Sequence, residues 1–236
     1  MKYPENLKKG DIIGICAPSQ GITKEKDIKR LEEAEKQLKE LGYNIIETDS
    51  VRKSEKGRSA SGEQRAREFM QLWKNKDVKL IIFAAGGDFL VDMLEYLDFD
   101  KIKKSEPKWL QGYSDITSLN YIFNTVLEIP SIYCQNIKDY AMRPLYPNLI
   151  NALKIASGEE VEQHSFEKYE KVIVSDVVEK EILYFESGDF AIVADTYCKY
   201  TSPYRCRTKS ECTGAASRPR DRGSSPTASD ISRISH

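Results

Sequence analysis

The sequence is poor in histidine: two of its 236 residues are histidines, His164 and His236. Its five cysteines form no CxxC pair and have no finger-like spacing with histidine, which argues against a zinc site and against a disulfide framework. No apolar run has the length of a signal peptide or of a membrane span. We therefore expect a cytoplasmic protein with reduced thiols, no bound metal and no membrane partner.

Neither sign of charge is in excess. The formal net charge is −1 at pH 7, with 31% charged and 40% hydrophobic residues. This is the composition of an ordinary globular protein, and it gives no electrostatic reason to expect a nucleic-acid partner. The sequence also contains no G-x-G-x-x-G and no P-loop motif, so a flavin or nucleotide site has little support.

Apolar runs alternate with amphipathic stretches through the first two-thirds of the chain. The apolar runs predict five strands, at 11–17, 43–48, 78–85, 107–111 and 130–134. The other stretches predict helices at 24–41, 61–74, 88–98, 115–127 and 146–158. Thr23 is a candidate N-cap for the first helix, and Ser61 with Gln64 forms a capping-box pattern for the second.

Strands that alternate with helices predict an α/β fold, with a parallel sheet that helices cover on both faces. The continuous apolar character of the strands agrees with burial on both sides. In such sheets a ligand binds at the C-terminal ends of the strands, near a switch in strand order. Three corners there are unusual: APSQG at 17–21, AAGGD at 84–88 and QGYSD at 111–115.

The periodicity weakens after residue 160, which divides the chain into three predicted parts. Residues 1–160 form the α/β domain, and residues 161–200, with two or three short strand patterns, begin an incomplete β-rich domain. Residues 201–236 are rich in Ser, Arg, Thr and Pro and nearly free of large aliphatic residues, so they cannot offset their chain entropy by burial. We expect this tail to be disordered or foreign to the fold, as a frameshift or read-through product would be.

Ser114 lies where the fourth predicted strand turns into a helix, and two hypotheses fit it. As a nucleophile, it would project its hydroxyl above the sheet, with Gly112 relieving crowding in the turn and the Asp115 amide facing a developing oxyanion. Ile116 stands where the G-x-S-x-G elbow has its second glycine, so that motif is incomplete. As an N-cap, Ser114 would simply begin the helix.

Gly86 and Gly87 follow the third predicted strand and have a similar ambiguity. They form either a tight turn or a place where backbone amides face a ligand closely, as an oxyanion hole requires. A serine at one strand end and paired glycines at the preceding one are two halves of an acyl-transfer site. The base is missing from this pattern, because His164 lies in a polar stretch that predicts an exposed residue and His236 ends the tail.

Five segments together resemble one known family. LKKGDIIGICAPS, GRSASGEQRAREF, IIFAAGGDFL, WLQGYSDITSL and MRPLY are similar, in this order, to motifs of the LD-carboxypeptidases, the serine peptidases of the muramoyltetrapeptide carboxypeptidase and microcin-immunity type. The resemblance covers residues 1 to about 170. It implies a flavodoxin-like N-terminal domain followed by a β-rich domain, in a cytoplasmic homodimer that needs no metal or organic cofactor.

The same resemblance implies a Ser–His–Glu triad and a chemistry. Family members release a terminal D-amino acid, such as D-Ala from murein tetrapeptide, and relatives cleave the peptidyl-nucleotide microcin C. Carried over by position, Ser114 is the nucleophile, Gly86, Gly87 and Asp115 form the oxyanion hole, and Glu186 is the candidate acid.

No histidine of this sequence matches the family's base. We therefore expect a C-terminally truncated or frameshifted chain whose peptidase activity is impaired. The alternatives are a non-catalytic protein that binds murein peptides and a microcin C-type hydrolase.

Overall fold

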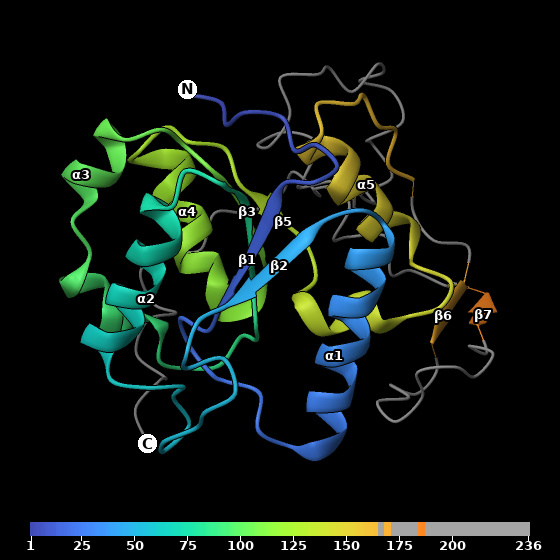
Figure 1. Cartoon of the computed structure of the whole chain (residues 1–236), viewed down its shortest axis with the longest axis horizontal. Coiled ribbons are helices and arrows are strands. Elements are labelled where there is room, and N and C mark those ends of the chain that lie inside the picture. The colour runs from blue at the N-terminus through green and yellow to red at the C-terminus, as the bar shows by residue number, and fades with distance from the viewer. Residues whose placement is uncertain (165–167, 171–183, 187–236) are drawn as a thin grey trace, which may run out of the picture. The chain divides into compact units, whose positions relative to one another are not determined.

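The computed structural model describes residues 1–164, 168–170 and 184–186. Five parallel strands form one sheet in the order β2-β1-β3-β4-β5 (Figure 1). The strands are β1 (Ile12–Cys16), β2 (Asn44–Glu47), β3 (Val78–Phe83), β4 (Trp109–Gly112) and β5 (Ile132–Tyr133). All five strands predicted in the first 160 residues are thus confirmed, each somewhat shorter than its apolar run.

Helices cover both faces of this sheet. They are α1 (Glu25–Glu40), α2 (Gly62–Lys74), α3 (Phe99–Lys104), α4 (Thr117–Thr125) and α5 (Pro147–Ala156), with 3₁₀ helices η1 (Leu90–Tyr96), η2 (Ser114–Ile116) and η3 (Ile137–Ala141). Helices α1 and α5 lie on one side and α2, α3 and α4 on the other (Figure 1). The predicted parallel α/β fold is therefore confirmed.

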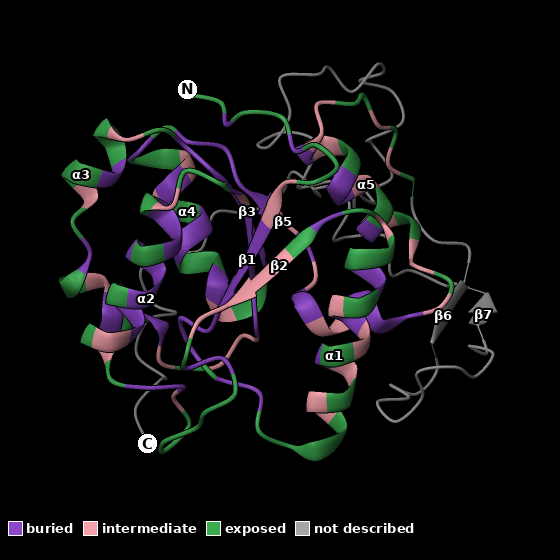
Figure 2. Cartoon of the chain, in the orientation of Figure 1, coloured by how far each residue is buried: buried purple, intermediate pink, exposed green. Residues whose placement is uncertain are grey.

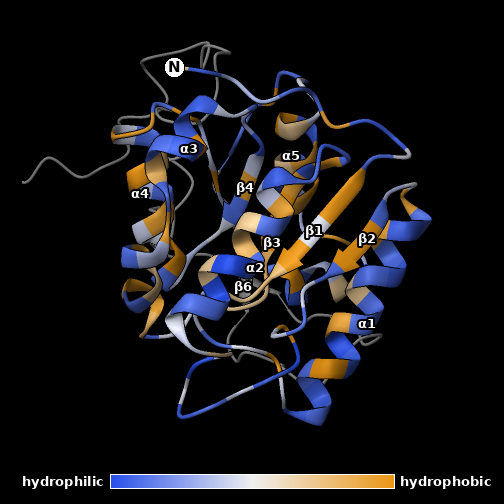
Figure 3. Cartoon of the chain, turned by 60° about the vertical axis from the view of Figure 1, so that its left-hand side comes forward, coloured by the Kyte–Doolittle hydropathy of each residue, from blue (hydrophilic) through white to orange (hydrophobic). Residues whose placement is uncertain are grey.

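Successive side chains of the central strands enter two separate hydrophobic cores. In β1, Ile13 and Ile15 pack with α1 and α5, whereas Cys16 packs with α2 and α4. In β3, Leu80 joins the first core and Ile81 joins the second. Figure 2 shows these central strands buried, and Figure 3 shows apolar strands between helices with polar outer sides. This two-sided burial explains why the strands read as continuous apolar runs.

The strand order changes direction between β1 and β3. The chain moves from β1 outward to β2 and then crosses to β3 on the other side of β1, which is the flavodoxin-type switch in strand order. The loops that follow β1 and β3 therefore leave the sheet in opposite directions. Both begin at the C-terminal ends of their strands, on the same side of the sheet. The loop after β4 also begins at the C-terminal end of its strand, and β4 lies next to β3.

Three local predictions were wrong or only partly right. Thr23 does not cap α1, because the N-cap position is Lys24 and no side chain closes it. Residues 90–96 of the predicted helix at 88–98 form the 3₁₀ helix η1. The Ser61 hydroxyl does accept from the Gln64 amide at 3.2 Å, but the Gln64 side chain donates to Glu68 instead of completing a capping box.

Beyond residue 164 the structure describes two short strands. They are β6 (Lys168–Glu170) and β7 (Tyr184–Glu186), which pair antiparallel. Strands were predicted in this region, whereas most of the proposed β-rich domain at 161–200 and the whole tail at 201–236 lie outside the described residues. The three domain boundaries stay predictions. In the described part of the chain, no helix is both long and apolar enough to cross a membrane.

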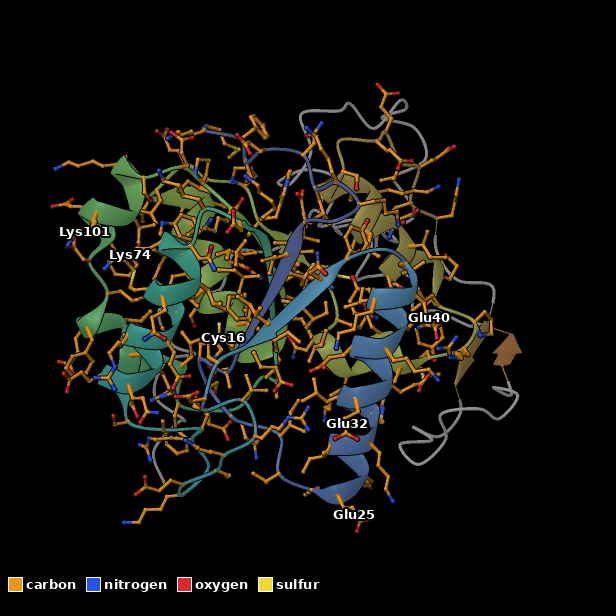
Figure 4. The ribbon with its side chains drawn as sticks, in the orientation of Figure 1. Cys16, Glu25, Glu32, Glu40, Lys74 and Lys101 are labelled. Atoms are coloured by element: carbon orange, nitrogen blue, oxygen red, sulfur yellow. The ribbon has the colours of Figure 1, made fainter. Side chains whose placement is uncertain are left out.

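Two carboxyl groups share a half-buried position between α1 and β2. Glu35 on α1 lies beside Glu47 of β2, and Arg52 contacts both carboxylates, at 3.6 and 2.7 Å. Glu32 and Glu40, on the same helix, are labelled in Figure 4. Burial, together with the neighbouring Glu47, raises the pKa of Glu35 to about 7. The native state therefore holds a proton on Glu35 that the unfolded chain releases at a lower pH.

Replacing Glu35 with Gln should stabilise the protein at alkaline pH. A raised native pKa means that stability falls as the pH rises from about 4.5 to about 7, so the cost is largest above pH 7. We expect Glu35→Gln to raise Tm at pH 8 by a few degrees, on the order of 1 kcal/mol, and to leave it almost unchanged at pH 4.5. Glu32→Gln is the control, because Glu32 also contacts Arg52 but is exposed. An equal or lower Tm for Glu35→Gln at pH 8 would contradict this account.

Candidate active site

The three unusual corners of the sequence meet at the C-terminal edge of the sheet. A β-carbon built on Gly86 would lie 2.9 Å from the Ser114 Oγ, so the loop after β3 lies directly against the turn after β4. A β-carbon on Gly87 would overlap the hydroxyl of Ser19, in the loop after β1. The structure therefore brings together Ser114, both glycines and a residue of the APSQG corner.

Ser114 is held in a strained backbone conformation. Its φ is +67°, in the left-handed region that costs a residue with a side chain about 1–2 kcal/mol. The side chain is exposed and closes no helix end, whereas the Thr117 hydroxyl donates to the Ser114 carbonyl. The N-cap hypothesis for Ser114 is thus wrong. A strained, exposed serine between a strand and a helix is the local geometry of a nucleophile elbow.

Close packing and two asparagines fix the corner that carries Ser114. Gly112 ends β4, and a β-carbon there would lie within 3.0 Å of Phe83, Ile116 and Asn136 atoms, as expected for a glycine that relieves crowding. The buried Asn120 donates to the Gly112 carbonyl at 2.9 Å. The Asn136 side-chain oxygen accepts from the Tyr113 amide at 3.4 Å. The chain can therefore leave β4 in essentially one direction.

The paired glycines belong to a loop that packs against Ser114 through Gly86 and against Ser19 through Gly87. Gly87 has φ +148°, a conformation that favours glycine, and the Gly86 carbonyl accepts from the Gln20 amide at 3.1 Å. Neither the Gly86 amide nor the Gly87 amide donates a hydrogen bond to any described residue. The Asp115 amide nitrogen lies 3.5 Å from the position of a Gly86 β-carbon. An unpaired amide in a glycine loop that packs against a serine side chain is a candidate component of an oxyanion hole.

The Asp115 side chain has a role that sequence reasoning missed. Its Oδ2 accepts hydrogen bonds from the Ser19 hydroxyl at 2.5 Å and from the Leu90 amide at 2.9 Å. Ser19 follows β1, and Leu90 follows the paired glycines. One carboxylate next to Ser114 therefore joins the loops after β1 and β3 to the turn after β4. The APSQG corner was a signal for Ser19, but nothing in the sequence marked the Asp115 carboxylate.

The described residues bring neither the base nor the acid of a triad to Ser114. Across the part of the chain that the structure describes, no side chain is hydrogen-bonded to its hydroxyl. His164 is 70% exposed, with its Nε2 3.5 Å from the Glu162 carboxylate, in agreement with the predicted surface position. Glu186 ends β7, but its side chain, like the whole of His236, lies outside what is described.

The two described cysteines are not competing nucleophiles. Cys16 and Cys134 are free thiols, and both are buried. Burial raises the pKa of Cys16 and raises that of Cys134 to about 12, so both stay protonated near neutral pH. Burial likewise raises the pKa of the half-exposed Tyr113 phenol beside Ser114, with a further contribution from Asp139. Within residues 1–164, 168–170 and 184–186, no cluster of His, Cys, Asp or Glu is placed to hold a metal ion.

Comparison with known proteins agrees with this geometry. The model of the LD-carboxypeptidase N-terminal domain matches residues 13–134. A carboxypeptidase homologue of Vibrio cholerae is 34% identical over 119 residues, which are 50% of this chain and 35% of that protein. The microcin C7 self-immunity protein MccF of Escherichia coli is 33% identical over 116 residues, 48% of this chain and 32% of its own length. The match thus spans about a third of these relatives.

Solved structures show the same fold. The apo structure of MccF superposes with a TM-score of 0.67 at 24% identity, over 78% of this chain and 57% of that one. The muramoyltetrapeptide carboxypeptidase of Oxalobacter formigenes superposes with a TM-score of 0.51 at 30% identity, over 59% of this chain and 45% of that one. The family match covers more than half of the sequence and contains Gly86, Gly87, Ser114 and Asp115. This chain therefore belongs to the LD-carboxypeptidase family.

Proposed function

We propose that the protein is a serine hydrolase of the LD-carboxypeptidase type, which removes a terminal D-amino acid, D-Ala, from murein tetrapeptide. The observation that carries this proposal is the strained and exposed Ser114, packed against Gly86 of a glycine pair whose amides donate no hydrogen bond to the described residues. The murein substrate is supported by the muramoyltetrapeptide carboxypeptidase among the structural relatives.

In the proposed reaction, a base takes the Ser114 proton while Oγ attacks the carbonyl that precedes the terminal D-residue. The negative charge that develops on the carbonyl oxygen is stabilised by the amides of Gly86 or Gly87 and of Asp115. The C–N bond then breaks, the D-amino acid leaves as a protonated amine, and the acyl group stays on Ser114. Attack by water, again with proton transfer to the base, releases the shortened peptide.

We propose in addition that the chain of 236 residues turns over slowly. The support is that His164 is exposed and contacts Glu162, and that the other histidine, His236, matches no position of the family's base. Glu186 is the candidate acid that would orient a histidine. Loss of the base costs serine hydrolases a factor on the order of 10⁶ in turnover, whereas the oxyanion hole and substrate binding still retain about 10³–10⁴ over water.

A second candidate reaction has the same nucleophile and a different leaving group. The similarity to MccF supports hydrolysis of a peptidyl nucleotide, since solved MccF structures hold adenosine monophosphate and glutamyl sulfamoyl guanosine. D-Ala release from murein tetrapeptide and nucleotide release from a microcin C analogue distinguish the two reactions directly. A homodimer and a cytoplasmic location belong to the proposal through the family alone.

Ser114 and an added base should account together for any hydrolysis. We expect slow release of D-Ala from murein tetrapeptide by the full chain, a rise of about tenfold or more with imidazole in the buffer, and no release by Ser114→Ala. An enzymatic assay for free D-Ala measures all three. Hydrolysis that survives in Ser114→Ala would refute the nucleophile. Tetrapeptide binding with the same Kd in both proteins, and no acyl-enzyme at any pH with or without imidazole, would favour a non-catalytic binding protein.

Gly86→Ala tests the contact between the two loops. The new β-carbon would lie 2.9 Å from both Cβ and Oγ of Ser114, so the hydroxyl must move. We expect kcat in imidazole to fall about 100-fold, because small misplacements of reacting groups have effects of this size. Gly10→Ala is the control: it changes a glycine with φ +91° that faces open space before β1, and it should leave kcat unchanged. Equal kcat values for the two variants would show that Gly86 does not position Ser114.

A further inference from the structure

A charged side chain is buried directly behind the candidate site. Arg65 on α2 is 1% exposed and is among the largest fully buried side chains. Burial lowers the pKa of Arg65, and the nearby carboxylate of Asp92 opposes that effect. Removing a cation from water is costly, and an apolar side chain of similar volume would often give equal or greater stability. Stability alone therefore does not explain an arginine at this position.

The Arg65 guanidinium connects the loops after β1 and β3. Its Nη1 donates to the Pro18 carbonyl at 2.5 Å and to the Phe89 carbonyl at 2.8 Å. Its Nη2 lies 3.7 Å from Asp92 Oδ2, which also accepts from Arg58 at 2.7 Å. Nε and Nη2 have no hydrogen-bond partner among the described residues. The Pro18 and Phe89 carbonyls are therefore the groups that accept hydrogen bonds directly from the buried Arg65 cation.

Both of those carbonyls lie one residue before a partner of Asp115. Ser19 follows Pro18, Leu90 follows Phe89, and both donate to the Asp115 carboxylate next to Ser114. Gly86 and Gly87 stand two to three residues before Phe89, in the loop that Arg65 holds. A short path of hydrogen bonds and peptide units therefore runs from the guanidinium to both halves of the site.

We propose that Arg65 is a positioning residue, whose paired hydrogen bonds to Pro18 and Phe89 hold the Gly86–Gly87 amides at the distance from Ser114 that acyl transfer requires. This inference rests on the proposed function for its catalytic consequence. The restraint of the two loops by Arg65 is a structural claim and does not depend on the proposed function. Arg65 acts through backbone carbonyls and needs no contact with the substrate.

Lys108 provides a matched control within the same chain. It is also a buried cation, 6% exposed, and burial lowers its pKa to about 8. Its Nζ donates to the carbonyls of Asn75 and Val78, at 2.7 and 2.6 Å. Val78 begins β3, so these contacts lie at the opposite end of the strand from Gly86. Lys108→Met removes the same kind of interaction without touching the candidate site.

The test compares Arg65→Met, Arg65→Lys and Lys108→Met in the full chain. We expect Arg65→Met to reduce kcat for D-Ala release in imidazole by about 10–100-fold with KM changed less than about threefold. Amide hydrogen exchange at Gln20, Phe89 and Leu90, whose amides donate hydrogen bonds within these loops, should accelerate at least about tenfold. Arg65→Lys should recover part of both effects, because an ammonium can reach two carbonyls, as Lys108 does. Lys108→Met should lower Tm while leaving kcat and these amides unchanged.

Two results would overturn the inference. One is an Arg65→Met protein that is less stable but has wild-type kcat and KM well below its Tm, which would make Arg65 purely structural. The other is unchanged hydrogen exchange at both loops. If the wild-type chain shows no Ser114-dependent hydrolysis even with imidazole, the proposed function fails, and the exchange measurement alone then decides whether Arg65 restrains the loops.

Discussion

The carboxylate of Asp115 is the interaction on which the geometry of the candidate site depends. A single oxygen accepts from the Ser19 hydroxyl and the Leu90 amide, so it joins three loops that leave three different strands. Hydrogen bonds to an ionised acceptor are stronger than neutral ones, and each of these is short. Because β1, β3 and β4 are parallel neighbours, their C-terminal ends lie at one edge, where a single side chain can reach all three loops.

That arrangement also explains how a strained serine persists. A φ of +67° at Ser114 costs about 1–2 kcal/mol, and the surrounding contacts must determine the turn strongly enough to offset it. Gly112 allows the chain to pass between Phe83 and Ile116, and Asn120 binds the Gly112 carbonyl. These contacts are made from a sheet that has a hydrophobic core on each face. The free energy gained by burying those cores is large compared with the cost of the strained backbone at Ser114.

Periodicity and corner chemistry were sufficient to predict the strands, the parallel fold and the approach of the Gly86–Gly87 loop to Ser114, which Gly86 contacts. The Thr23 cap and the helical form of 88–98 were predicted wrongly, because local propensity does not reveal how tertiary packing sets helix ends and 3₁₀ turns. The contact between Ser19 and Asp115 spans 96 residues, and such side-chain contacts leave no trace in a single sequence. The buried position of Arg65 was hidden for the same reason, since an arginine in an amphipathic helix is ordinarily an exposed one.

The site divides into a part that is preorganised and a part that must transfer a proton. Among the described residues, the contacts that fix Ser114, the paired glycines and Asp115 come from residues 18–136, nearly all of them inside the family's N-terminal domain. Stabilisation of an oxyanion depends on dipoles that are already in place, and the proposed donors all belong to this part of the chain. Proton transfer depends instead on one group with a suitable pKa at hydrogen-bond distance. The two requirements are separable, so the proposed oxyanion site of this domain is compatible with a base that another segment or the solvent supplies.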